Sequence, residues 1–203
     1  MLSRVVVVMT GPTLSKKSVI ANYLHLRLRV GLIESAFLGP YARRNVPDDA
    51  LRDARRRRLT ALARVYVKDE LPVIVDSAFG TRKSRREFVS AMSKTNSTVN
   101  YLFVCCYSAD SVLREIRRSD RERRDDAREV QSLTRAESDR LLLSYEDPRN
   151  DGRALAGAVS ALVVVDTDSN FVSVSRPART TALTSLAFDV AGELQRGFAR
   201  GNI

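Results

Sequence analysis

The sequence predicts an α/β fold with three layers, in which helices cover both faces of a central, mostly parallel sheet. Short apolar runs alternate with helical patterns along the chain. Most of these runs are apolar throughout, as expected for strands that are buried on both faces of a parallel sheet. The first run also ends at a glycine turn that leads directly into a helical pattern.

Five apolar runs are predicted to form the strands of this sheet: residues 5–8, 30–34, 71–76, 98–107 and 161–167. Helices are predicted at 17–28, from Asp48 or Asp49 onward, at 81–93, after Tyr107, at 141–145 and after Pro177. Residues 35–47 contain Gly39-Pro40 and Pro47 and are predicted to form a loop.

Composition favours an ordinary globular protein. The 203 residues are 44% hydrophobic and 29% charged, which predicts one domain over residues 1–203 with a sizeable core. No apolar run reaches the roughly 20 residues needed to cross a bilayer. Cys105 and Cys106 are adjacent within an apolar run and are interpreted as buried thiols in a reducing compartment. A cytoplasmic location is therefore expected.

The net charge of +10 is the main compositional anomaly. It favours polyanionic partners such as nucleotides, phosphorylated metabolites or nucleic acid. A general bias toward arginine explains the charge equally well, because arginine clearly outnumbers lysine in this chain. Charge alone therefore assigns no function.

Residues 11–18 match the phosphate-loop pattern G-x-x-x-x-G-K-[ST] at every position but one, where Lys16 replaces the second glycine. In such a loop, backbone N–H groups at a helix start bind phosphate. A lysine (here Lys17) adds a cation, and the hydroxyl of Ser18 is a ligand for Mg²⁺. A side chain at position 16 is expected to be tolerated where the backbone is helical; otherwise weaker ATP binding or a changed donor is expected. The candidate nucleotide contacts in the loop are Gly11, Thr13, Ser15, Lys16, Lys17 and Ser18.

Two acidic residues end predicted strands downstream of this loop. Asp76 is the last residue of the third run, and Asp166 lies at the end of the fifth. Ligands of open α/β sheets bind at the carboxyl ends of the strands, where both residues and the loop are expected to meet. Asp76 is the candidate for holding magnesium or its water, so ATP and Mg²⁺ are the expected ligands.

These features resemble the P-loop small-molecule kinases and most resemble their zeta-toxin-like, predicted-kinase branch. Chloramphenicol phosphotransferase, gluconate kinase and the kinase half of polynucleotide kinase are also similar. The resemblance covers roughly residues 3–168. It is carried by residues 11–18, by 73–79 with Arg82, Arg85 and Arg86, by 117–125 and by 165–167. It implies a P-loop NTPase fold with an arginine-rich lid at about residues 114–150.

The resemblance also implies roles for individual residues. Lys17 and Ser18 would bind phosphate and magnesium, and Asp76 would be the acid beside the magnesium. Arg117, Arg121 or Arg124 would clamp the transferred phosphoryl group from the lid. The segment after Asp166 would lie by the adenine. Glu34 stands where the family usually has a catalytic aspartate, and an ordinary carboxylate at a strand end is an equally good interpretation of it.

The function expected from these residues is a kinase that transfers the γ-phosphate of ATP to a hydroxyl of a small, anionic molecule. The acceptor region is expected at residues 35–70, and the candidate acceptor contacts are Arg43, Arg44, Arg55 and Arg82. A polynucleotide 5′-kinase or a nucleic-acid-binding protein is one alternative, although no aromatic residues are interleaved with the arginines. A degenerate P-loop scaffold is another. Either a monomer or a homodimer fits the sequence.

Overall fold

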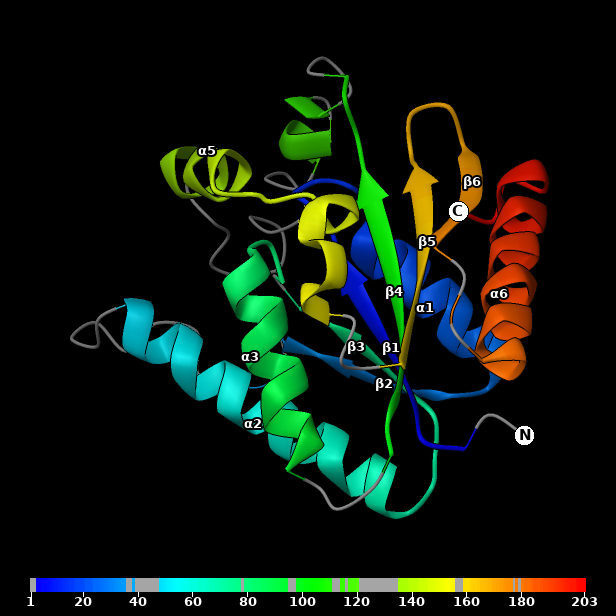
Figure 1. Cartoon of the computed structure of the whole chain (residues 1–203). Helices are drawn as coiled ribbons and strands as arrows, with labels where there is room; N and C mark the ends of the chain where they lie inside the picture. The colour runs from blue at the N-terminus through cyan, green and yellow to red at the C-terminus, as the bar shows by residue number, and fades with distance from the viewer. Residues whose placement is uncertain are drawn as a thin grey trace.

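The computed structural model of the chain contains one six-stranded sheet with the order β2-β3-β1-β4-β5-β6 (Figure 1). Its strands are β1 (Val5–Thr10), β2 (Gly31–Glu34), β3 (Val73–Asp76), β4 (Asn100–Tyr107), β5 (Val159–Asp166) and β6 (Phe171–Arg176). The residues described by the structure are 3–35, 38, 48–77, 79–94, 98–110, 114–115, 117–120, 135–155, 159–176, 178 and 180–203.

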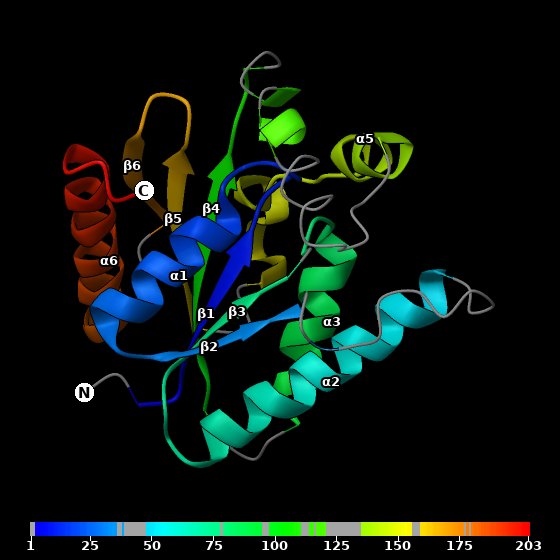
Figure 2. The same cartoon turned by 180° about the vertical axis from the view of Figure 1, so that it is seen from behind.

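Helices cover both faces of this sheet, which confirms the predicted three-layer α/β fold (Figures 1 and 2). Helices α1 (Lys17–Leu28) and α6 (Thr181–Ala199) pack on one face, and α2 (Asp48–Lys68) and α3 (Arg82–Ser93) pack on the other. Helix α5 (Arg135–Leu143) and the 3₁₀ helix η2 (Pro148–Leu155) follow β4 in the chain. No described helix combines the length and the apolar character that a membrane span requires.

The sixth strand corrects the predicted count of five. Strands β1 to β5 pair with one another in the parallel direction. Strand β6 follows β5 after a four-residue turn and pairs with it in the antiparallel direction. The sequence of β6 alternates Val172 and Val174 with serines, and the strand lies at the edge of the sheet, where it is only partly buried. The search for continuous apolar runs therefore missed it.

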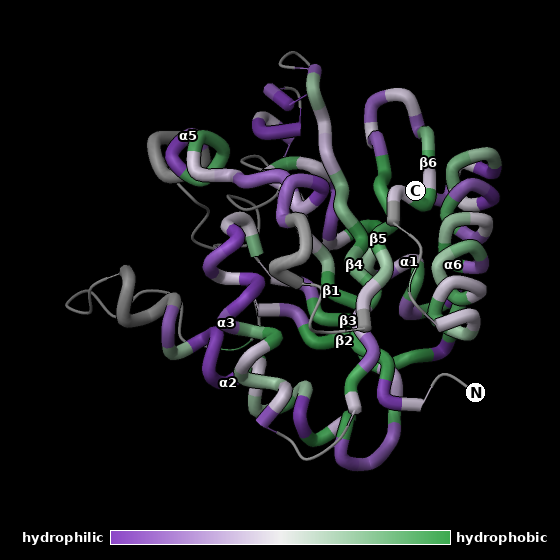
Figure 3. Tube along the Cα trace, in the orientation of Figure 1, coloured by the Kyte–Doolittle hydropathy of each residue, from purple (hydrophilic) through white to green (hydrophobic). Residues whose placement is uncertain are grey.

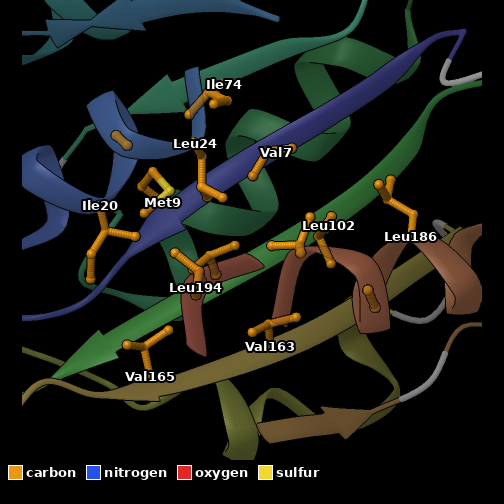
Figure 4. Packing of buried hydrophobic residues seen from close by; sticks show 14 of the residues in the cluster. Val7, Met9, Ile20, Leu24, Ile74, Leu102, Val163, Val165, Leu186 and Leu194 are labelled. Carbon is orange, nitrogen blue, oxygen red and sulfur yellow. The ribbon is translucent and has the colours of Figure 1, made fainter. Parts of the chain in front are cut away.

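Strand β1 shows why the apolar runs become central strands. Val5, Val7 and Met9 pack against α1 and α6, while Val6 and Val8 pack against α2 and α3. Both sets are buried because successive side chains of a strand point to opposite faces. Figure 4 shows the first of these two cores, with Val7 and Met9 near Ile20 and Leu24 of α1 and Leu194 of α6.

Helix α2 turns an apolar stripe toward the sheet. Leu59, Ala63 and Val67 of α2 recur every four residues and are fully buried. Hydrophobic residues accordingly concentrate in the strands and on the helix faces against them (Figure 3). The cysteines of β4 lie in this interior, and burial raises the pKa of the Cys105 thiol to about 11.

The register of the strands brings their carboxyl ends to one edge. Glu34 is the strand partner of Asp76, and Asp76 is in turn the partner of Met9. On the other side, Tyr107 is the partner of Asp166. The candidate site residues at the ends of β2, β3 and β5 therefore lie along the edge where β1 leads into the loop before α1.

Candidate functional site

Gly11 begins the loop between β1 and α1 and accepts no side chain. Its φ of 144° lies in a region that favours glycine. A Cβ atom built at this position would lie 1.9 Å from the carbonyl oxygen of Cys106 and 2.9 Å from Ser15 Oγ. The loop therefore packs tightly against the end of β4.

Lys16 has a left-handed backbone, with φ 56° and ψ 17°. The right-handed helical backbone on which a side chain was expected to be tolerated is therefore absent at this position, and weaker ATP binding or a changed donor is the expectation that remains. Leu14, two residues earlier, also has a positive φ of 66°. A non-glycine residue in this region costs on the order of 1–2 kcal/mol, and conformations of this kind turn successive N–H groups into anion-binding concavities.

The first turn of α1 has backbone amides that no side chain of the helix itself caps. Lys16 is the N-cap residue; no side chain caps the helix, and the first turn contains no acidic residue. The positive end of the helix dipole is therefore open to an anion at this point. Lys17 Nζ lies over the loop and donates a hydrogen bond to the carbonyl of Pro12 at 2.5 Å. Ser15 Oγ donates to the same carbonyl at 2.9 Å.

Ser18 and Asp76 are in direct contact. Ser18 Oγ donates a hydrogen bond of 2.6 Å to Asp76 Oδ2, which joins the first turn of α1 to the end of β3. Asp76 is only 6% exposed. A hydroxyl beside a buried carboxylate is an oxygen donor set of the kind that Mg²⁺ prefers.

Glu34 lies at the end of β2, next to Asp76 in the sheet. Its Oε1 accepts a hydrogen bond of 2.8 Å from Asn22 Nδ2. Burial raises the pKa of Glu34, the Asn22 hydrogen bond lowers it, and the nearby Asp76 carboxylate raises it again, with a net upward shift. A carboxylate with a raised pKa beside a phosphate loop has the properties of a general base.

Arg117 joins the loop to the turn after β5. Its guanidinium donates to the Leu14 carbonyl at 3.2 Å and to the Thr167 carbonyl at 3.2 Å, and it pairs with Asp168 Oδ1 at 3.2 Å. The pKa of Lys16 is lowered by burial and by the charge of Arg117, while Asp168 raises it. Arg117 and Lys16 therefore form a cationic pair beside the loop.

The carboxylate of Asp166 stabilises the turn between β5 and β6. It accepts hydrogen bonds from the Asp168 amide at 3.0 Å and from Ser169 Oγ at 2.7 Å. Burial raises the pKa of Asp166, but the hydrogen bonds together lower it by more, so this pKa lies below its ordinary value. The predicted nucleotide contact at this position thus has a structural role in the turn.

Asp168 was missed by the sequence analysis. It accepts hydrogen bonds from Ser108 Oγ at 2.7 Å and from the Asp110 amide at 2.9 Å, in addition to its pairing with Arg117. It therefore holds the turn after β5 against the segment after β4. The polar run 166–170 after an apolar strand was the available signal, because it is typical of a turn.

Arg82, a predicted acceptor contact, bonds η2 through its side chain. Its side chain donates to Asp151 Oδ1 at 3.3 Å and to the Asn150 carbonyl at 2.6 Å, both in η2. The neighbouring Arg85 is completely buried and bonds both oxygens of Asp151, at 2.6 and 2.7 Å. The sequence analysis missed this ion pair.

Arg85 also supports the connection after β3. Its Nη1 donates to the Phe79 carbonyl at 2.9 Å, and Thr10 Oγ1 at the end of β1 donates to the same carbonyl at 2.9 Å. The segment that follows Asp76 is therefore fixed to both β1 and η2.

The remaining predicted contacts are only partly placed. Arg55 lies on α2 and is half-buried. Arg43, Arg44, Arg121 and Arg124 lie outside the described residues. Thr13 lies in the loop before α1 and is half-buried.

Comparison with known proteins shows similarity at the level of structure only. Neither family models nor curated proteins match the chain. A sugar kinase from Janibacter sp. is 18% identical and has a TM-score of 0.58 over 95% of this chain and 98% of that one. Chaetomium thermophilum Kti12 in complex with ADP-AlF3 is 20% identical, with a TM-score of 0.57 over 91% and 95%. The Mycobacterium tuberculosis APS kinase with AMPPNP and APS is 16% identical, with a TM-score of 0.53 over 96% and 99%.

These similarities extend over nearly the whole length of each chain. At identities of 16–20% they concern the fold. The chain therefore has the P-loop kinase fold that its sequence resembles, with the loop of residues 11–18 in the position where that fold begins its first helix.

Proposed function

We propose that this protein is a kinase that transfers the γ-phosphoryl group of ATP to a hydroxyl of a small, anionic molecule. The observation that carries the proposal is the 2.6 Å contact between Ser18 and Asp76. It brings a phosphate-loop hydroxyl and a buried carboxylate together at the carboxyl edge of the sheet. The P-loop kinase fold of the chain is a second, independent support.

In this proposal the phosphates of ATP lie in the loop of residues 11–18. Gly11 lets the backbone turn without a side chain, and the amides at the start of α1 point toward the anion. Lys17 supplies a cation over the loop, and Lys16 and Arg117 supply further positive charge beside it. Thr13 and Ser15 complete the loop.

Ser18 and Asp76 would hold Mg²⁺, because they are the oxygen donors in contact at the start of α1. When bound, ATP supplies the phosphoryl group, and the metal neutralises charge on its oxygens. Asp76 keeps the Ser18 hydroxyl oriented, and the connection fixed by Arg85 holds the chain that follows Asp76.

Glu34 is the proposed general base. Its raised pKa suits a carboxylate that takes a proton from an acceptor hydroxyl. Asn22 orients the carboxylate by its hydrogen bond to Oε1. The proton moves from the acceptor hydroxyl to Glu34 as the hydroxyl oxygen bonds to the γ-phosphorus, while the bond from that phosphorus to the β–γ bridging oxygen breaks and ADP leaves.

The acceptor is proposed to bind between the ends of β2 and β3 and the segment 35–70. Arg43, Arg44 and Arg55 remain proposed contacts for its anionic group. Arg121 and Arg124 remain proposed clamps from the lid. Arg82, which also bonds η2, remains a proposed contact as well.

The test is the release of ADP from Mg·ATP in the presence of hydroxyl compounds with and without a phosphate group. We expect ADP release together with a phosphorylated product for at least one anionic acceptor, and weaker transfer to its neutral counterpart. Nucleotide binding without transfer to any acceptor in a broad panel would contradict the proposal and favour a P-loop scaffold.

A further inference from the structure

A cavity of about 680 Å³ lies between α2 and α3, on the face of the sheet opposite α1. The two helices lie side by side in both views (Figures 1 and 2). The described residues that line the cavity come from these helices and the turn before α3 and include none of residues 11–18. None of Lys17, Ser18, Glu34 and Asp76 lines this cavity, although its α2 wall lies within the segment 35–70 that is proposed to contact the acceptor.

The lining carries an excess of positive charge. Four cationic side chains (Arg56, Arg57, Arg64 and Lys83) face two acidic ones (Asp53 and Glu87). Arg56 bonds both carboxylates: it meets Asp53 Oδ1 at 2.6 Å and also pairs with Glu87 of α3. Arg56 therefore neutralises much of the acidic charge and joins the two helices across the cavity.

Three cations are then left to face a ligand. Arg64 is half-buried, and its Nη2 is anchored by the Ala91 carbonyl. Arg57 is exposed, and the Lys83 side chain is 86% exposed, with its Nζ 4.0 Å from Glu87. These side chains come from both helices, so an anion between them would be contacted from two sides.

We propose that this cavity binds the phosphate group of a small phosphorylated molecule, at a site separate from the loop of residues 11–18. Its volume falls within the ~300–1,000 Å³ typical of small-molecule pockets. The excess of two positive charges complements a phosphate dianion, and guanidinium groups bind phosphate with paired hydrogen bonds.

The same lining disfavours a nucleic-acid strand as the ligand. The side chains of Asp53 and Glu87 are 55% and 44% exposed and interrupt the cationic lining, so the cavity offers no continuous row of cations to a phosphate backbone. Phe88 is the aromatic residue in the lining, and at 1% exposure it offers no face for a base to stack on.

The proposal is tested by calorimetric titration with inorganic pyrophosphate, a probe that both the cavity and the phosphate loop should bind. We expect two sites in the unaltered protein. Arg57→Ala/Lys83→Ala should weaken one of them by about tenfold or more, equivalent to ~1.4 kcal/mol, and leave the other unchanged. Both residues lie at the surface, so the variant should fold normally.

The matched control is Lys68→Ala/Arg86→Ala, which removes the same charge from exposed positions of the same two helices outside the cavity. It should keep both sites. Equal weakening by the two double variants would overturn the proposal, because binding would then follow net charge. A single site that Arg57→Ala/Lys83→Ala leaves unchanged would also overturn it, whereas a single site that this variant weakens would instead contradict the phosphate loop. Tighter binding of a single-stranded oligonucleotide that displaces pyrophosphate from the cavity would overturn it as well.

Discussion

Ser18 Oγ donates a 2.6 Å hydrogen bond to the buried carboxylate of Asp76, although the two residues are 58 positions apart in the chain. The contact exists because β1 and β3 are parallel neighbours whose carboxyl ends meet beside the start of α1. It is therefore a property of the sheet order as much as of the two side chains.

The first prediction concerns this contact. Ser18→Ala and Asp76→Asn should each raise the Mg²⁺ concentration needed for half-maximal stabilisation by ATP, by about tenfold or more. Binding of ATP without metal should change less, since the loop amides and Lys17 remain. Thermal unfolding across a magnesium titration measures both effects. Asp69→Asn, at an exposed position, is the control, and an unchanged magnesium requirement in the two site variants would count against the assignment.

The second prediction concerns the proposed base. Glu34→Gln should lower kcat by about 10²–10⁴-fold, the usual contribution of a general base. Asn22→Ala removes a hydrogen bond that lowers the pKa of Glu34, so this pKa should rise. The acidic limb of the kcat profile should then move to higher pH, because Glu34 must be deprotonated to act. Rate–pH profiles of the three proteins test this; activity retained in Glu34→Gln would exclude the role.

The third prediction separates backbone strain from charge at Lys16. Glycine adopts a φ of 56° freely, so Lys16→Gly should leave the free energy of unfolding unchanged or raise it by up to about 1 kcal/mol. Lys16→Ala keeps the strain but loses the charge. If the ammonium group contacts phosphate, both variants should bind ATP more weakly, by about tenfold. Stronger ATP binding by Lys16→Gly would show that the lysine impairs the loop.

The fourth prediction concerns stability in acid. Glu193 of α6 accepts hydrogen bonds from Arg196 at 2.7 Å, Arg27 of α1 at 2.6 Å and Tyr23 at 2.9 Å. These bonds lower its pKa to about 2, below its ordinary value of 4.5. The stabilisation is therefore complete above pH 4.5 and is lost as the pH falls toward 2.

Glu193→Gln should destabilise the protein by about 2 kcal/mol at pH 7, in the range of hydrogen bonds to charged groups. Its deficit relative to the unaltered protein should shrink between pH 4.5 and 2. Urea unfolding at a series of pH values measures the deficit at pH 7 and its change with pH, with Asp189→Asn, at an exposed position of the same helix, for comparison. A deficit that stays constant over this range would mean that the carboxylate is not held in its charged form.

Much of this fold can be predicted from the sequence because its central strands are buried on both faces. The run Val5-Val6-Val7-Val8 is short, β-branched and apolar throughout, which favours a strand of this kind. The edge strand β6 was missed because half of its side chains are polar. Its short alternating pattern resembles that of many loops.

The part of the candidate site that could be predicted consists of residues at strand ends and residues of the phosphate-loop motif. Ser18, Asp76 and Glu34 lie together because parallel strands end at one edge. The left-handed backbone of Lys16 could not be predicted, since a lysine gives no signal for a positive φ. The ion pair of Arg85 and Asp151 was equally hidden, because 66 residues separate its partners and no motif in the sequence includes Asp151.

Equilibrium binding of Mg·ATP to the unaltered protein and to Lys17→Ala tests the central claim most directly. The unaltered protein and the exposed-site control Lys68→Ala should bind with the same affinity. Lys17→Ala should remain folded and bind about 100-fold more weakly, a loss of ~2.7 kcal/mol. If Lys17→Ala binds as tightly as the unaltered protein, or if the unaltered protein binds no nucleotide, residues 11–18 are not a working phosphate loop.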